Sequence, residues 1–97
     1  MIYFMLPIMR FKIADKSMEP ALREGDYVVV SKLDCLFRKP KIEDVVVVKH
    51  KGMFMIKRIK KIHDDKYFVQ GDNRKYNSPI KIERKQIVGK VLLHIRR

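Results

Sequence analysis

Short runs of apolar residues alternate with clusters of glycine, proline, aspartate and asparagine along the whole chain. The runs are rich in valine and isoleucine, and such runs between turn-forming residues are typical of strands. The pattern therefore predicts a mainly β protein. The predicted strands span residues 26–33, 44–49, 53–62, 66–70 and 86–95.

Two breaks between these runs have the composition of hairpin turns. Lys51-Gly52 separates residues 44–49 from residues 53–62, and Asp64-Asp65 follows the second of these runs. A two-residue connection of this kind reverses the chain. We therefore expect the runs on either side of Lys51-Gly52 to pair as antiparallel strands.

Helical content is expected to be small. Residues 18–24 have the proline and helix-forming residues of a single helical turn, and they follow Ser17 directly. Residues 34–43 are predicted to form an irregular excursion. The predicted fold is thus mainly β, with at most one short helical turn after Ser17.

The first nine residues are apolar up to Arg10. This is about half of the ~20 residues that a helix needs to cross a bilayer, so the segment is not predicted to be a transmembrane anchor. It also lacks the basic leader and the small-residue cleavage site of a secretory signal. A first strand and a segment that dips into a membrane surface both remain open, and we favour the strand.

Length and charge narrow the function classes only partly. The chain has 97 residues and 46% hydrophobic residues, which suits one domain over residues 1–97. A formal net charge of +12 favours contact with polyanions or anionic lipid. The lysines are spread along the chain without interleaved aromatic residues, so a nucleic-acid surface is not predicted. The single Cys35 can form no internal disulfide and is interpreted as structural.

Lys57 lies in an unexpected place within its predicted strand. Alternate residues of a strand share a face, so Lys57 lies in one row with Met55 and Ile59. The opposite row ends in Arg58 and Lys60 and is expected to face solvent. A lysine buried without an acidic partner favours its neutral form, which a general base requires. The alternative is that Lys57 extends its amine into water, and alternation alone favours that alternative.

Ser17 precedes Met18-Glu19-Pro20. Pro20 keeps Glu19 out of the helical conformation and bends the chain, so the Ser17 hydroxyl is well presented. Alone, Ser17 would be an ordinary turn residue or helix cap. A neutral lysine can, however, take the proton of a serine hydroxyl. Ser17 and Lys57 together therefore indicate a Ser/Lys serine protease.

Several motifs follow one another in a fixed order. They are Ser17-Met18-Glu19-Pro20-Ala21-Leu22, Gly25-Asp26-Tyr27-Val28-Val29-Val30, Pro40 with Asp44-Val45-Val46-Val47, Lys57-Arg58-Ile59, Gly71-Asp72-Asn73-Arg74 and Val88-Gly89-Lys90. In residues and order they resemble the signal peptidase I family, over about residues 13–91. The resemblance implies a small β-barrel-like assembly of short antiparallel strands with a Ser/Lys dyad on one face. It implies neither a metal nor an organic cofactor.

By this resemblance Ser17 is the nucleophile and Lys57 the general base of a serine endopeptidase. An acyl-enzyme forms on Ser17 and is hydrolysed by water that the same lysine activates. Asp72 and Arg74 are expected to hold their loop by ion pairs or hydrogen bonds, and Ser78 to match a serine that orients the lysine. The site-supporting residues implied in this way are Met18, Pro20, Arg58, Asp72, Asn73, Arg74 and Ser78.

The chain departs from the family near the predicted site. Asp15 stands where many bacterial members have a serine that assists the oxyanion, and a carboxylate facing an oxyanion would repel it. Ser78 lies one residue further from Arg74 than in the family, and a second acidic residue is absent. Two hypotheses therefore stay open: an active protease that removes N-terminal leader or pro-segments, and a catalytically impaired binding module on the same fold.

The resemblance also bears on partners and location. It implies a protein or peptide substrate with an N-terminal extension, while the absence of an anchor predicts a soluble protein, cytoplasmic or peripherally bound to an anionic membrane. The chain has no Ala-Gly pair of the kind cut in self-cleaving repressor proteases. A basic nucleic-acid-binding β-barrel is a third hypothesis, but it explains the charge alone. The three histidines lack metal-ligand spacing.

Overall fold

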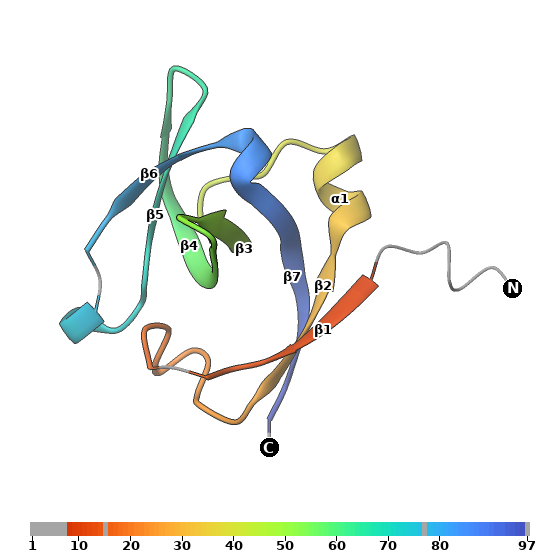
Figure 1. The fold of residues 1–97 in the computed structure, drawn as a ribbon, viewed down its shortest axis with the longest axis vertical. Coiled ribbons are helices and arrows are strands. Elements are labelled where there is room, and N and C mark those ends of the chain that lie inside the picture. The colour runs from red at the N-terminus through yellow and green to blue at the C-terminus, as the bar shows by residue number, and fades with distance from the viewer. Residues whose placement is uncertain (1–7, 15, 77, 97) are drawn as a thin grey trace, which may run out of the picture.

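Figure 1 shows the computed structural model, which describes residues 8–14, 16–76 and 78–96. The described residues form a seven-stranded antiparallel sheet in the order β1-β2-β7-β3-β4-β5-β6. The sheet curves strongly, so that β1 lies across the molecule from β3 and β4 (Figure 1). The strands are β1 (Ile8–Lys12), β2 (Tyr27–Ser31), β3 (Val45–His50), β4 (Met53–His63), β5 (Lys66–Gln70), β6 (Ile80–Glu83) and β7 (Ile87–Ile95).

The mainly β prediction is confirmed. β2, β3, β4, β5 and β7 agree with the five predicted strands to within two residues at each end. β1 confirms a first strand from Ile8 onward, while residues 1–7 lie outside the described residues. β6 was not predicted, because its four residues alternate apolar and charged too briefly to stand out.

Both predicted hairpin turns are present. Lys51 and Gly52 have φ values of 52° and 78°, and Asp64 and Asp65 have φ values of 48° and 62°. Two successive residues with positive φ form the turn whose twist matches that of paired strands. β3 and β4 accordingly pair antiparallel around Lys51-Gly52, as predicted.

Helical structure lies mostly elsewhere than expected. Residues 16–22 form successive turns, with hydrogen bonds from the Glu19 N–H to the Lys16 carbonyl (3.1 Å) and from the Leu22 N–H to the Met18 carbonyl (3.0 Å). A short helix, α1 (Lys32–Phe37), instead occupies part of the segment predicted to be irregular. Six residues give too little periodicity to predict a helix, and packing against β7 and β1 stabilises it.

The other helical elements are single 3₁₀ turns, η2 (Arg74–Tyr76) and η3 (Arg84–Gln86). None of the helices in the described part of the chain is long and apolar enough to cross a membrane.

Two hydrophobic clusters lie on opposite faces of the curved sheet. Val46 and Val47 are neighbours in β3, yet they belong to different clusters because successive side chains of a strand point to opposite faces. The first cluster is Val46, Val48, Ile59, Tyr67, Val69, Ile82 and Ile87. The second is Ile13, Met18, Leu22, Val28, Val30 and Val47. The second cluster thus packs the turns after Ser17 onto the sheet.

Gly89 allows β7 to pass close to β2, and we expect Gly89→Ala to destabilise the fold. An added Cβ would lie 2.5 Å from Val30 Cγ1 and 3.0 Å from the Ser31 carbonyl oxygen. Overpacking of this kind costs about 1–3 kcal/mol in the free energy of unfolding. Urea denaturation measures it, with the exposed Leu93→Ala on the same strand as control. Equal stability of the two variants would contradict this account of β7.

Candidate active site

Ser17 lies on the connection between β1 and β2. The base of this connection is closed by hydrogen bonds from the Ile13 N–H to the Asp26 carbonyl (2.7 Å) and from the Gly25 N–H to the Ile13 carbonyl (2.8 Å). Met18 is 1% exposed and anchors the segment in the second cluster. Ser17 itself is 8% exposed. A nucleophile candidate is therefore held on a packed turn rather than on a free loop.

Lys57 lies on β4 and is also 8% exposed. Ile59 beside it on the same face is fully buried, which confirms the predicted apolar row. No carboxylate among the described residues forms an ion pair with the Lys57 amine. The opposite row was expected to face solvent, but it is partly buried. Ile56 packs against the second cluster, which contains Met18 and Leu22 from the turns after Ser17, and Arg58 is half-buried.

The turn formed by Gly71, Asp72 and Asn73 connects these two regions. The Asn73 backbone N–H donates to the Ser17 carbonyl (2.8 Å), and its side-chain amide donates to the Lys16 carbonyl (2.8 Å). Asp72 accepts hydrogen bonds from Arg58 Nε (3.0 Å) and Nη2 (2.8 Å). The same turn is therefore bonded both to the segment that carries Ser17 and to the residue that follows Lys57.

Arg58 makes the strongest polar contact of this site. Its guanidinium holds both Asp72 oxygens and donates a further hydrogen bond from Nη1 to the Glu43 carbonyl (3.0 Å). The hydrogen bonds to Asp72 raise the pKa of Arg58, although partial burial acts in the opposite direction. Arg58 is thus always charged, and its planar fork fixes the orientation of the Asp72 carboxylate.

Three other predicted supporting residues, Arg74, Ser78 and Pro20, are exposed. Arg74 is exposed and forms no ion pair with another described residue, and the partner of Asp72 is Arg58. Ser78 is exposed, and its hydroxyl makes no hydrogen bond to a described residue. Pro20 is exposed after a cis Glu19–Pro20 peptide bond. Asp15 lies outside the described residues.

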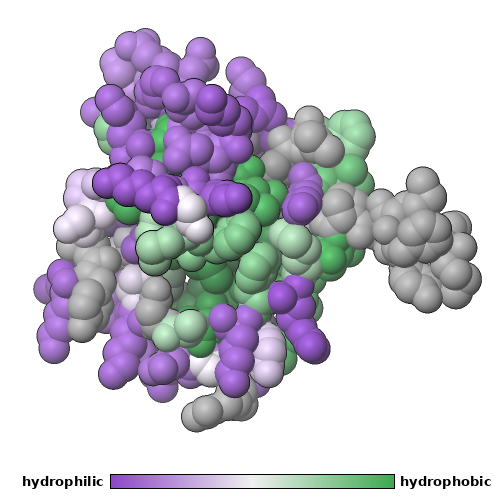
Figure 2. Space-filling model, viewed as in Figure 1, coloured by the Kyte–Doolittle hydropathy of each residue, from purple (hydrophilic) through white to green (hydrophobic). Residues whose placement is uncertain are grey.

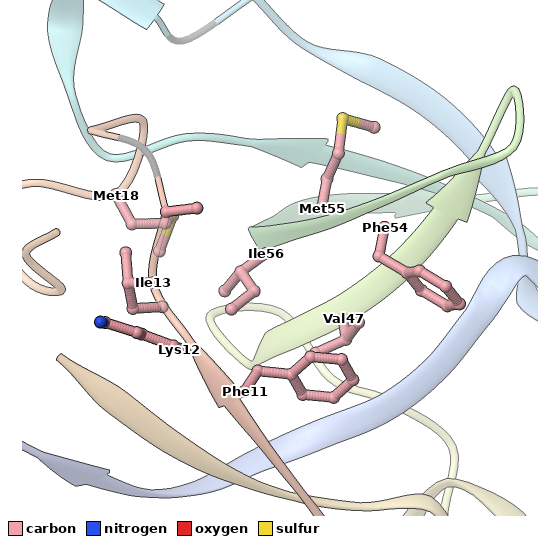
Figure 3. Close-up of a pocket in the computed structure, with 9 residues that line it drawn as sticks. Phe11, Lys12, Ile13, Met18, Val47, Phe54, Met55 and Ile56 are labelled. Atoms are coloured by element: carbon pink, nitrogen blue, oxygen red, sulfur yellow. The ribbon is translucent and has the colours of Figure 1, made fainter. Parts of the chain in front are cut away.

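An apolar pocket of about 110 Å³ opens between β1 and the β3–β4 hairpin. Its lining is Phe11, Lys12, Ile13, Ala14, Met18, Val47, Phe54, Met55 and Ile56. Figure 3 shows Ile13, Met18 and Ile56 near one another, with the rings of Phe11 and Phe54 further along. In Figure 2 green atoms surround a hollow at the centre of the face, and purple atoms cover much of the rest. Met18 and Ile56, which both line the pocket, are the sequence neighbours of Ser17 and Lys57.

Sequence reasoning missed a second polar anchor of the Ser17 segment. His94 Nε2 lies 2.7 Å from Asp26 Oδ2, which also accepts a hydrogen bond from the Arg23 N–H (3.0 Å). Both side chains are mostly buried. The Gly25-Asp26 motif pointed to Asp26, but nothing in the sequence pairs it with a histidine 68 residues away. The pair ties the base of the Ser17 segment to β7.

No group of three or more His, Cys, Asp and Glu side chains in the described ranges is placed to hold a metal ion. The chemistry that the arrangement offers is that of a buried hydroxyl, a buried amine and an adjacent apolar pocket.

The structure is thus a curved antiparallel sheet that carries a buried serine and a buried lysine. A scan against family models matches residues 7–92 to Peptidase S24-like, and the chain belongs to this family. A comparison with curated proteins finds no match.

We expect Asp72→Asn to destabilise the protein, because it weakens a half-buried bidentate ion pair. The loss should be about 1.5–3 kcal/mol in the free energy of unfolding, as for hydrogen bonds to charged groups. Glu43→Gln is the matched control, since Glu43 pairs with Lys60 on the exposed surface and should contribute less than about 1 kcal/mol. Urea denaturation at neutral pH compares them. A larger loss in Glu43→Gln would contradict the assigned importance of Asp72.

Proposed function

We propose that the protein is a serine endopeptidase in which Ser17 is the nucleophile and Lys57 the general base. The observation that carries the proposal is the turn at residues 71–73, which bonds to the Ser17 segment on one side and to Arg58 on the other. These contacts restrict how far the two segments can separate. The order of the motifs around Ser17 and Lys57 supports the same roles.

The environment of both groups suits this chemistry. A hydroxyl attacks a peptide carbonyl only when a base removes its proton, and we assign this role to Lys57, a buried amine without a carboxylate partner among the described residues. Lys57 would take the Ser17 proton as Oγ bonds to the carbonyl carbon. The protonated amine would then give this proton to the departing amine, and the peptide C–N bond would break. Water, deprotonated by Lys57, would release the acyl group from Ser17.

The pocket indicates how a peptide would bind. β1 is an edge strand of the sheet that the described residues form, so an extended peptide can bond to the backbone groups of its outer edge. An apolar side chain of that peptide would enter the pocket between β1 and β4. We infer a protein or peptide substrate with an extended, accessible segment, and the resemblance to signal peptidase I makes an N-terminal leader or pro-segment the best candidate.

A second candidate function, a binding module without catalysis, has one observation in its favour. Ser78 is exposed and has no hydrogen bond within the described structure, so no orienting contact to Lys57 is seen from it. Such a module would bind the same peptide in the same pocket and leave it intact.

Reaction with a fluorophosphonate probe separates the two candidates. We expect the probe to label Ser17, and Ser17→Ala and Lys57→Met to lose both labelling and cleavage of leader peptides by at least ~100-fold, the usual scale of a lost base. Lys61→Met, an exposed lysine of the same strand, is the control and should react like wild type. Circular dichroism verifies folding. Peptide binding without labelling would instead favour the binding module.

The pocket can be filled without disturbing either cluster. Ala14 lines it and is exposed, so we expect Ala14→Phe to leave stability and probe labelling nearly unchanged while it raises KM for leader peptides about tenfold or more. Steady-state cleavage kinetics measure this effect. An unchanged KM would show that the pocket does not hold substrate, even if Ser17 reacts.

A further inference from the structure

The surface around α1 combines exposed apolar side chains in a way that the proposed chemistry does not use. Phe37 is 79% exposed, and Leu33 lies one turn before it on the same side of the helix. Ile8 is 51% exposed at the start of β1. Ile8 pairs with Ser31, the residue before α1, so it belongs to the same corner. Green atoms reach the surface where Figure 1 places α1 (Figure 2).

Basic residues flank these apolar side chains in the sequence. The exposed cations next to the helix are Lys32, Arg38 and Lys39. None of the three forms an ion pair with a carboxylate whose side chain the structure describes. Asp34 is the single acidic residue in the sequence from 32 to 42. We call residues 8, 32, 33 and 37–39 the α1 corner.

An apolar centre with flanking cations is complementary to an anionic bilayer surface. The ring of Phe37 and the aliphatic side chains can enter the boundary between headgroups and acyl chains, while lysine and arginine bind the lipid phosphates. A nucleic acid would use the cations but would find one aromatic ring among aliphatic side chains, which offer its bases little to stack on. We propose that the α1 corner docks the protein on an anionic lipid bilayer, with Phe37 inserted at the interface.

This inference does not depend on the proposed peptidase activity, but docking would also place the outer edge of β1 near the membrane. β1 begins at Ile8 in the α1 corner and ends next to the pocket. A docked molecule would therefore hold the outer edge of β1 close to the bilayer, where a segment emerging from the lipid could pair with it.

The chain has no tryptophan, so single-tryptophan variants report insertion directly. Phe37→Trp should show a blue-shifted emission on vesicles of phosphatidylcholine with phosphatidylglycerol, and no shift on phosphatidylcholine alone. Met53→Trp is the matched control, since Met53 is 63% exposed at the β3–β4 hairpin. An equal shift at both positions, or none at position 37, would overturn the proposal.

Vesicle co-sedimentation tests the cations. Arg38→Glu/Lys39→Glu should lower binding to anionic vesicles about tenfold or more, because each basic residue contributes separately at the membrane surface. Lys81→Glu/Lys85→Glu changes the net charge equally on exposed residues elsewhere and should lower binding far less. Equal losses would show that the overall charge alone drives binding. Tight, salt-sensitive binding of a single-stranded oligonucleotide without vesicle binding would overturn the proposal in favour of a nucleic-acid surface.

Discussion

The bidentate ion pair between Arg58 and Asp72 is the contact on which the site depends. It joins β4, which carries Lys57, to the turn after β5, and Asn73 of that turn bonds to the backbone at Lys16 and Ser17. Arg58 also holds the Glu43 carbonyl before β3. Three segments that are distant in sequence therefore meet through one guanidinium, whose charge does not vary with pH in the physiological range.

Much of the fold follows from local patterns in the sequence. Valine-rich runs and two-residue turns predict the strands and hairpins because both signals act between residues that are close along the chain. The burial of Lys57 agrees with its place in the row of Ile59, but alternation alone does not establish it, because Lys61 lies two positions beyond Ile59 and is exposed.

The features that could not be predicted are those that depend on tertiary contacts. α1 is stabilised by packing on β7 and β1, and β6 by pairing with β5. The contact between Asp26 and His94 joins residues that are 68 positions apart, and an isolated histidine gives no sign of its partner. The resemblance to a family indicated that Asp72 supports the site, but it did not distinguish Arg58 from Arg74 as the partner.

Both apolar packing and polar contacts position Ser17 and Lys57. Met18, next to Ser17, belongs to the second cluster, whereas Ile59, on the same face of β4 as Lys57, belongs to the first. Ile56, the residue before Lys57, packs against the second cluster, so apolar packing already brings β4 and the Ser17 segment together. The turn at residues 71–73 adds polar contacts to both segments, and these contacts set the position of one segment relative to the other. Directional hydrogen bonds suit this task better than apolar packing, because they fix both distance and orientation.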